Sequence, residues 1–575
     1  MALRKDGSTE TDPTEVLRIW RRFSTEISNS VPEEEGIYND DYKLEVESRL
    51  ELLRGLRLHQ PELDRRITDA EIFTAIRRLK VGKAGGIDGI LTSILKPAAK
   101  AVGTDRMEAS NGVIEALSLL FNFVFEKEVW PERWGQGIIF PLYKEDSRLD
   151  PGNYRPITLL SVVGKLFGSI LENRLSTWSE GSNALSDHQG GFRRGRGTPD
   201  LIFLLREIIL TRKSVGAATY ATFIDARKAF DTVWREGNYV RLYDLGVRGK
   251  MWRQLQVMNR DRQSKIRLPF GETEWFRISR GTAQGAVESP WLYACFINGL
   301  VEDMSRRNLG VRVGGRLVPM LMYADDIVML AGSQSELQQM NAVASAHAQR
   351  NRYRHNGKKS AVMLLCASRA ARAAFDAAEW KLSGEPVKVK TKYKYLGIDL
   401  LTTVSNWRPY ITRVMGKAAR ISEDLSHICR RDAGLRPRSV ATLWKSIVRP
   451  VLEYASEIWA GDLPVDLARS AEAIQTSFLK SILGLKGCES IPLDSLRAEM
   501  GMEKLSSRWA KLRLGYFYRL HQANPERTLR SVARLRRTQF LRGDRPGTRG
   551  WMHGTHALLT RLGLARFWQI MRAAG

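Results

Sequence analysis

The sequence predicts an α+β fold in which a mixed region of helices and strands is followed by a helical region. From Ile67 to about Leu400, helical patterns alternate with short apolar runs of strand character. After Gly397 the strand signals fade and amphipathic helical patterns take over. The chain has 575 residues, of which 43% are hydrophobic, so it can bury a large core in a multi-lobed enzyme or in several domains.

The individual helices are predicted from the spacing of their apolar residues. Ile114–Glu126 has large apolar residues at helical intervals, and Val162–Trp178 has a similar pattern. Beyond Gly397 the same criterion predicts amphipathic helices at Ile411–Cys429, Ser439–Trp459 and Leu467–Leu483.

The chain is strongly basic. It has 90 Lys and Arg residues against 63 Asp and Glu residues, a net charge of +27, which predicts salt-sensitive attraction to a polyanion. No apolar run is long enough to span a bilayer, and Met1–Asp12 lacks the apolar core of a signal peptide. We therefore expect an intracellular protein of the nucleus and/or cytoplasm, not secreted and without a membrane partner. The sequence leaves its oligomeric state open.

The four cysteines do not form a recognisable site. They lie far apart and lack the Cys/His spacing of a zinc site. Isolated thiols are typical of a reducing compartment, which agrees with the expected location.

Two adjacent carboxylates lie in a predicted hairpin. Tyr323-Ala324-Asp325-Asp326 separates the apolar runs Leu317–Met322 and Ile327–Ala331, a pattern of strand, tight turn and strand. Adjacent aspartates repel each other, so a turn that presents both favours a cation. A divalent metal shared with a triphosphate is one hypothesis, and a solvated turn is the alternative.

A third carboxylate follows another predicted strand. The β-rich run that starts at Tyr220 ends in Asp225. Two metal ions about 3.5–4 Å apart need oxygen ligands from more than one backbone segment. Asp225 at a strand end, together with Asp325 and Asp326 in a hairpin, could supply them.

These segments together resemble the polymerase portion of the reverse transcriptases of non-LTR (LINE-like) retrotransposons. The resemblance runs in order along most of the chain, and the ordered set is far more specific than any one motif. The matching segments are Ile67–Gly89, Ile139–Lys144, Asn153–Leu160, Gln189–Thr198, Phe223–Asp231, Arg280–Pro290, Tyr323–Asp326, Asn356–Ser360 and Tyr393–Gly397.

The resemblance implies a right-hand polymerase with fingers, a palm built on a small antiparallel sheet plus helices, and an α-helical thumb. The expected divisions are an N-terminal extension (1–66), a fingers-associated segment (67–122), fingers and palm (123–400), and a helical thumb with a basic C-terminal region (401–575). Within the last, Arg527–Arg549 contains eight arginines and one acidic residue. A solvated basic tail and a nucleic-acid contact both remain open.

The implied activity is RNA-directed DNA synthesis, a nucleotidyltransferase reaction that extends a DNA primer on an RNA template with dNTPs. Two Mg²⁺ ions would serve as cofactors, activating the primer 3′-hydroxyl and neutralising the pyrophosphate. By resemblance, Asp225, Asp325 and Asp326 are the catalytic and metal-binding residues. Asp231 is expected to cap the following helix instead.

The resemblance also implies contacts to the incoming nucleotide. Lys144 and Arg155 would grip the triphosphate, for which the planar guanidinium of arginine is well suited. Phe230 would lie under the sugar and exclude a 2′-hydroxyl, with a core phenylalanine as the alternative.

Three further positions belong to the expected nucleotide site. Gln284 and Gly285 would lie beneath the template and the nucleotide, with Gly285 allowing a close backbone approach. Lys358, or else Lys359, would protonate the leaving pyrophosphate. Glu288 departs from the small apolar residues that are usual there, and a carboxylate near a polyanion is unfavourable unless it points away or pairs with a base.

Nucleic-acid contacts are expected from two other motifs. Phe192, Arg193 and Arg196 combine an aromatic ring with cations, which suits single-stranded RNA, whereas an ordinary basic loop is the alternative. Tyr395 and Gly397 resemble the hairpin that grips the primer.

Rival hypotheses remain. A maturase-like or RNA-copying polymerase would use the same metals, but Phe230 argues against ribonucleotides. A catalytically decayed reverse-transcriptase-like RNA-binding scaffold is disfavoured by the intact aspartates. A membrane-surface protein is disfavoured by the absence of an amphipathic anchor pattern. No segment resembles an endonuclease or a Cys/His knuckle, so we expect the polymerase part of an element or a truncated copy.

Overall fold

A five-stranded sheet lies at the centre of the computed structural model, which describes residues 2–3, 8–29, 36–99, 112–144, 146–404, 406–431, 435–488, 490–543, 548–564 and 566. Its pairings are antiparallel except for the last. The strand order is β11 (Met320–Tyr323), β12 (Asp326–Ala331), β5 (Thr219–Ile224), β13 (Ala361–Leu365) and β16 (Lys388–Val389).

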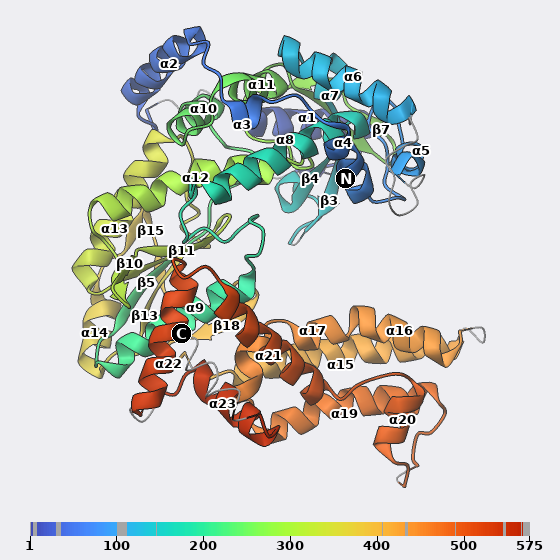
Figure 1. The fold of residues 1–575 in the computed structure, drawn as a ribbon, viewed down its shortest axis with the longest axis vertical. Coiled ribbons are helices and arrows are strands. Elements are labelled where there is room, and N and C mark those ends of the chain that lie inside the picture. Colours follow the sequence, from blue (N-terminus) through green and yellow to red (C-terminus); the bar gives the residue numbers. More distant parts are fainter. Residues whose placement is uncertain are drawn as a thin grey trace.

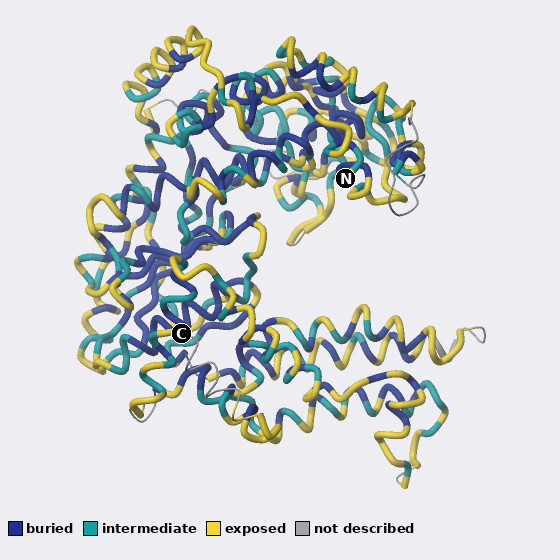
Figure 2. Tube along the Cα trace, viewed as in Figure 1, coloured by how far each residue is buried: buried dark blue, intermediate teal, exposed yellow. Residues whose placement is uncertain are grey.

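The central strands are almost continuously apolar because helices cover both faces of the sheet. Ala221 and Phe223 of β5 pack in one core cluster with α9 (Thr198–Ser214). Ile224 packs in the other cluster, with α12 (Ser289–Arg306) and α13 (Gln334–Arg350). Figure 2 shows these strands as buried. The acidic residues at the strand ends are therefore held on a rigid layer.

A second sheet lies in the upper part of Figure 1. β3 is antiparallel to β4 and parallel to β6. The strands are β3 (Gln136–Tyr143), β4 (Tyr154–Leu159), β6 (Gln263–Leu268), β7 (Gly271–Glu272) and β8 (Phe276–Arg277).

The N-terminal helix α1 (Pro13–Ser28) packs on this second sheet. Its Val16 and Trp20 share a core cluster with Ile139 of β3 and Ile266 of β6. This part of the N-terminal extension is therefore an integral piece of the fold and not a linker.

Helices surround the second sheet. Those predicted at Ile114–Glu126 and Val162–Trp178 are confirmed as α6 and α8. The set is α2 (Asp40–Gly55), α3 (Pro61–Asp64), α4 (Asp69–Arg78), α5 (Thr92–Leu95), η2 (Lys96–Ala99), α6 (Gly112–Lys127), α7 (Glu132–Gly135), η3 (Pro151–Asn153), α8 (Val162–Gly181), α10 (Arg235–Asp244) and α11 (Gly249–Arg260).

One buried ion pair ties α8 to α4. The Arg174 guanidinium donates to both carboxylate oxygens of Glu71 at 2.8 Å and to the carbonyl of Leu63. Burial opposes ionisation of Glu71, but Arg174 and the Thr68 N–H outweigh it and lower its pKa to about 2. The pair therefore depends on pH.

We expect this pair to contribute to acid unfolding. Because the folded-state pKa of Glu71 is depressed, its stabilisation is present above the unfolded-state value and is lost as the pH falls through the folded-state value. The thermal midpoint of a Glu71→Gln variant should therefore fall less than that of the native chain between about pH 5 and pH 2. Parallel curves for the two chains, measured by circular dichroism, would contradict this expectation.

Small hairpins and one helix lie between the strands of the central sheet, and the last hairpin leads to the C-terminal helices. They are β9 (Val311–Val313) with β10 (Arg316–Val318), α14 (Arg369–Ala377), β14 (Lys381–Leu382) with β15 (Glu385–Pro386), and β17 (Lys392–Tyr395) with β18 (Ile398–Leu401). A further pair, β1 (Ala2–Leu3) and β2 (Thr9–Glu10), lies at the N-terminus.

The chain continues as helices after β18, as predicted. The single helix predicted at Ser439–Trp459 is wrong: it breaks before Pro450 and again at Ala455, whose φ is +55°. The helices are α15 (Arg408–Arg431), α16 (Pro437–Ile447), α17 (Arg449–Glu453), α18 (Ser456–Trp459), η4 (Ala460–Asp462), α19 (Val465–Ile482), α20 (Leu493–Glu499), α21 (Leu505–Gln522), α22 (Thr528–Arg542) and α23 (Trp551–Arg561).

The basic C-terminal segment folds back onto the central region. α22 lies against α9, and Arg536 on α22 is 1% exposed. A solvated tail is therefore wrong for Thr528–Arg542, while residues 544–547 lie outside the described part of the chain. Among the described residues, none of the helices combines the length and the apolar character that crossing a bilayer requires.

Candidate active site

The Asp325–Asp326 pair lies in the tight turn between β11 and β12. Tyr323 pairs with Asp326, which leaves Ala324 and Asp325 at the tip. Ala324 has φ +58°, a left-handed conformation that is unfavourable for a residue with a Cβ atom. The turn thus has a conformation that its surroundings must stabilise.

Asp225 lies next to this turn. β5 pairs antiparallel with β12, with Ile224 opposite Ile327, so the following position places Asp225 alongside Asp326. The Asp225 N–H donates to Ser360 Oγ at 3.2 Å, and the Asn356 N–H donates to the Asp225 carbonyl at 2.8 Å. The structure therefore brings the three predicted carboxylates together from separate strands.

The three carboxylates are all harder to ionise than usual. Burial of its carboxyl group raises the pKa of Asp326 to about 6, with Asp325 and Asp225 adding to the effect. Burial also raises the pKa of Asp225, where Lys359 opposes and Asp325 reinforces the shift. The pKa of Asp325 is raised by burial against the influence of Lys144 and Arg155. A bound cation would relieve this repulsion.

The donor set fits a hard divalent cation, because it consists of carboxylate oxygens at the wall of an open cavity. Within the described part of the chain, however, no group of three or more His, Cys, Asp or Glu side chains is positioned to hold a metal ion as it stands. The carboxylates therefore suit a divalent cation by their chemistry and by their position at the cavity, but they are not arranged as a preformed metal site.

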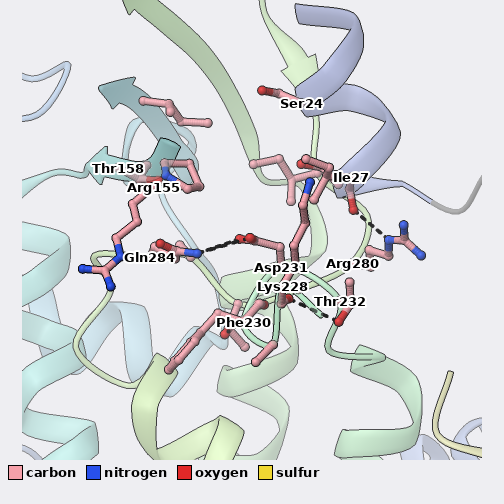
Figure 3. Close-up of a pocket in the computed structure, with 18 of the residues that line it drawn as sticks. Ser24, Ile27, Arg155, Thr158, Lys228, Phe230, Asp231, Thr232, Arg280 and Gln284 are labelled. Carbon is pink, nitrogen blue, oxygen red and sulfur yellow. Dashed lines mark hydrogen bonds between the residues drawn. The ribbon is translucent and has the colours of Figure 1, made fainter. Parts of the chain in front are cut away.

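A cavity of about 1090 Å³ opens beside the carboxylates and is lined by several cations. Asp225 and Asp325 line it together with Lys144 and Arg155 of the β3–β4 hairpin. Figure 3 shows the Arg155 side chain at this cavity. The cavity thus combines carboxylates with cations that can bind a polyphosphate.

Of the two lysines that the sequence left open, Lys359 is the one beside the carboxylates. Lys359 lines the cavity and acts electrostatically on Asp225, whereas Lys358 is not among the lining residues. Lys359 therefore replaces Lys358 as the candidate at this position.

Phe230 lies in an aromatic cluster at the cavity wall. Its ring stacks on Tyr293 at 5.0 Å and meets the edge of Phe192 at 5.9 Å. Phe192 is 42% exposed and has φ +59°, so its ring faces the open side. Phe230 is therefore half-buried at the cavity and is not an ordinary core phenylalanine.

Gln284 and Asp231 form a contact on the cavity wall (Figure 3). Gln284 Nε2 donates to both Asp231 oxygens, at 3.1 and 3.2 Å. The expectation that Asp231 caps a helix is wrong, because α10 begins four residues later and has no side-chain cap. Gly285 approaches β4 so closely that an added Cβ would lie 2.4 Å from the Thr158 carbonyl oxygen.

Glu288 is buried, at 4% exposed, and precedes α12. It faces two cations, since its charge opposes the burial-induced lowering of the pKa of Lys165 and of Arg262. The unusual carboxylate is thus buried near two bases and is not among the residues that line the cavity.

Arg193 and Arg196 do not fit their expected nucleic-acid role. Arg193 is 6% exposed; its Nε donates to Glu180 at 2.5 Å and its Nη1 to the Ser186 carbonyl. Arg196 donates to Asp187 at 2.6 Å. Both guanidinium groups therefore hold the loop together, and only Phe192 of the three faces the cavity.

Tyr395 and Gly397 lie at the turn between β17 and β18. Tyr395 is 2% exposed, and its ring packs edge-on against Phe223 at 5.7 Å, which does not fit a nucleic-acid contact. Gly397 has φ +81°, and an added Cβ would come 3.1 Å from the Tyr454 ring. This turn thus docks on the C-terminal helices.

The sequence analysis missed one wall of the cavity. α1 contributes Phe23 and Ile27 to the lining. The Lys228 ammonium lies over the Phe23 ring at 4.2 Å, and Arg280 Nε donates to the Ile27 carbonyl at 2.8 Å. No local motif marks these α1 residues, so only the tertiary structure identifies them.

Residues 142–400 match the family model described as reverse transcriptase (RNA-dependent DNA polymerase). The probable RNA-directed DNA polymerase from transposon BS of Drosophila melanogaster is 26% identical over 68% of this chain and 42% of that protein. The polymerase from the mobile element jockey of the same species is 26% identical over 63% of this chain and 40% of that protein.

The Pol polyprotein from the retrotransposable element R2 of Nasonia vitripennis is 29% identical over 41% of this chain and 23% of that protein. The chain thus spans about two fifths or less of the length of these relatives. Among solved structures, apo telomerase from Candida tropicalis covers 91% of this chain and 91% of that one, at 12% identity and a TM-score of 0.38. The chain carries a reverse transcriptase domain and is related to the RNA-directed DNA polymerases of non-LTR retrotransposons.

Proposed function

We propose that this chain is an RNA-directed DNA polymerase that extends a primer 3′-hydroxyl with dNTPs on an RNA template. The observation that carries the proposal is the meeting of Asp225 with the Asp325–Asp326 turn beside a cavity lined by Lys144 and Arg155. The family of the domain and its relatives support the same reaction.

Asp225, Asp325 and Asp326 would hold two Mg²⁺ ions. When bound, these ions would activate the primer hydroxyl and neutralise the pyrophosphate. Lys144 and Arg155 would bind the triphosphate oxygens from the opposite side. Lys359, next to Asp225, would deliver a proton to the leaving pyrophosphate.

Phe230, Gln284 and Gly285 would form the nucleotide-binding surface, with Phe230 excluding a 2′-hydroxyl. Phe192, on the exposed side of the aromatic cluster, would stack on a base. We assign fingers and palm to 123–400, the associated segment to 67–122, and the thumb to 401–575. The extension 1–66 packs α1 on the fingers sheet.

The test is primer extension on poly(rA)/oligo(dT) with Mg²⁺. We expect the native chain to incorporate dTTP in strong preference to UTP, because the Phe230 ring leaves little room for a 2′-hydroxyl. A Phe230→Ala variant should raise relative UTP use by about 10- to 100-fold. The exposed Phe270→Ala change is the matched control and should leave the ratio unchanged.

Two results would redirect the proposal. Unchanged sugar discrimination in Phe230→Ala would remove that residue from the site. A native chain that binds RNA but incorporates no dTTP would favour the decayed RNA-binding scaffold.

A further inference from the structure

The loop at residues 186–191 lies directly against the acidic turn. The Gly190 N–H donates to the Met322 carbonyl at 2.8 Å, and the Met322 N–H donates to the His188 carbonyl at 2.9 Å. These bonds extend the central sheet by one bridge at its β11 edge. The backbone just before the turn is therefore fixed by residues about 130 positions earlier in the chain.

Gln189 reaches from this loop to the turn itself. Its side chain is completely buried, and its Oε1 accepts the N–H of Gly191 at 2.8 Å and the N–H of Ala324 at 3.2 Å. Ala324 is the left-handed residue that precedes Asp325. Without Gln189, a buried N–H would lose its acceptor at the least favourable backbone position of the turn.

The loop at residues 186–191 packs closely against the acidic turn. A Cβ atom at Gly191 would lie 2.4 Å from the Ala324 nitrogen. The Nε2 atom of Gln189 has no hydrogen-bond partner among the described residues. Among these residues only its acceptor oxygen forms hydrogen bonds, and that oxygen joins the loop at Gly191 to the turn at Ala324.

The far side of the loop is attached to the C-terminal helix α22. Asp187 accepts the N–H of Thr528, the first residue of α22, at 2.5 Å. Arg196 donates to the same carboxylate at 2.6 Å, and Arg527 lies 3.5 Å away. A carboxylate at a helix N-terminus is stabilising, so Asp187 acts as a long-range cap for α22.

We propose that Gln189 is a positioning residue for Asp325 and Asp326, and that α22 supports it by docking on Asp187. The C-terminal segment thereby takes part in setting the acidic turn, although none of its described residues lines the cavity. This inference rests on the proposed function and adds a residue that holds the catalytic carboxylates through the backbone of Ala324.

The test compares Gln189→Met, which keeps the length but loses the acceptor, with Gln189→Glu, which keeps an acceptor oxygen. In single-turnover dTTP incorporation, Gln189→Met should lower the maximal rate by about 10- to 100-fold, because small displacements of reacting groups have effects of this size. The half-saturating dTTP concentration and the dissociation constant for primer–template should stay within about twofold of native. Gln189→Glu should recover most of the rate.

Asp187→Ala should also lower the rate of dTTP incorporation, by a smaller factor than Gln189→Met. The matched control is Asp466→Ala, which removes an exposed carboxylate paired with Arg408 and should leave the rate unchanged. A native rate in Gln189→Met would overturn the inference while leaving the proposed function intact.

A second readout does not depend on activity. Mn²⁺ binding, followed by the electron paramagnetic resonance signal of the free ion, should be weaker in Gln189→Met than in native protein. Equal Mn²⁺ affinity in Gln189→Met and native protein would overturn the inference. A native chain that binds Mn²⁺ but incorporates no dTTP would reject the proposed function alone.

Discussion

A chain with both Asp325→Asn and Asp326→Asn is expected to lose primer extension by more than about 10³-fold, equivalent to about 4 kcal/mol of transition-state stabilisation. The reason is electrostatic. Burial raises the pKa of all three carboxylates, and repulsion from neighbouring aspartates adds to the effect at Asp225 and Asp326. Such a site gains most from a divalent cation, and amides would remove the charge that attracts it.

The measurement is dTTP incorporation on poly(rA)/oligo(dT) with Mg²⁺, alongside RNA binding at several salt concentrations. Incorporation should disappear while RNA affinity and its salt dependence stay close to native, because no Lys or Arg is changed. Asp376→Asn, an exposed carboxylate on α14, is the matched control. Comparable incorporation by the double variant and the native chain would reject the assignment of these carboxylates.

The strands and the three carboxylates were predictable because each depends on local sequence. Asp225 ends an apolar β-rich run, and Asp325–Asp326 lie between two such runs. The structure pairs β5 with β12 antiparallel, and this pairing brings the carboxylates together. The segments were therefore predictable, whereas their pairing is known from the structure.

Side-chain direction was much less predictable. Phe192 and Arg193 are neighbours in one motif, yet Phe192 is 42% exposed and Arg193 is 6% exposed. The difference arises because Glu180 on α8 pairs with Arg193, a tertiary contact that no spacing in the sequence marks. Likewise, Lys359 lines the cavity and its neighbour Lys358 does not, a choice that the sequence left open. Local motifs therefore predict which segments form the site, whereas tertiary contacts determine which of their side chains face the cavity.

The sequence also did not predict how the C-terminal segment is attached, because this attachment depends on tertiary contacts. Glu207 on α9 is fully buried and interacts with two arginines. It accepts from Arg536 Nε at 2.8 Å, from Arg206 Nη1 at 3.1 Å and from the Trp551 N–H at 3.0 Å. Burial opposes ionisation of Glu207, but these donors outweigh it and keep its pKa low. One carboxylate thus joins α9, α22 and the start of α23.

A Glu207→Gln variant is expected to destabilise this attachment by about 3–5 kcal/mol, because it leaves buried guanidinium charge without its counter-charge. Exchange of the α9 and α22 amide hydrogens with solvent should accelerate accordingly. Glu499→Gln, at an ion pair with Arg438 whose side chains are 70% and 80% exposed, is the control and should have no measurable effect.

Replacing both Glu207 and Arg536 by apolar residues should destabilise the attachment of α22 less than removing the charge of Glu207 alone. A Glu207→Leu/Arg536→Met double variant leaves Arg206 bound to Asp462 at 2.5 Å and substitutes apolar volume for the remaining charges. Its exchange rates at α22 should therefore lie between those of the native chain and Glu207→Gln. If Glu207→Gln exchanges no faster than Glu499→Gln, this network does not hold α22 in place, and the attachment must depend on apolar packing of Leu529 and Val532.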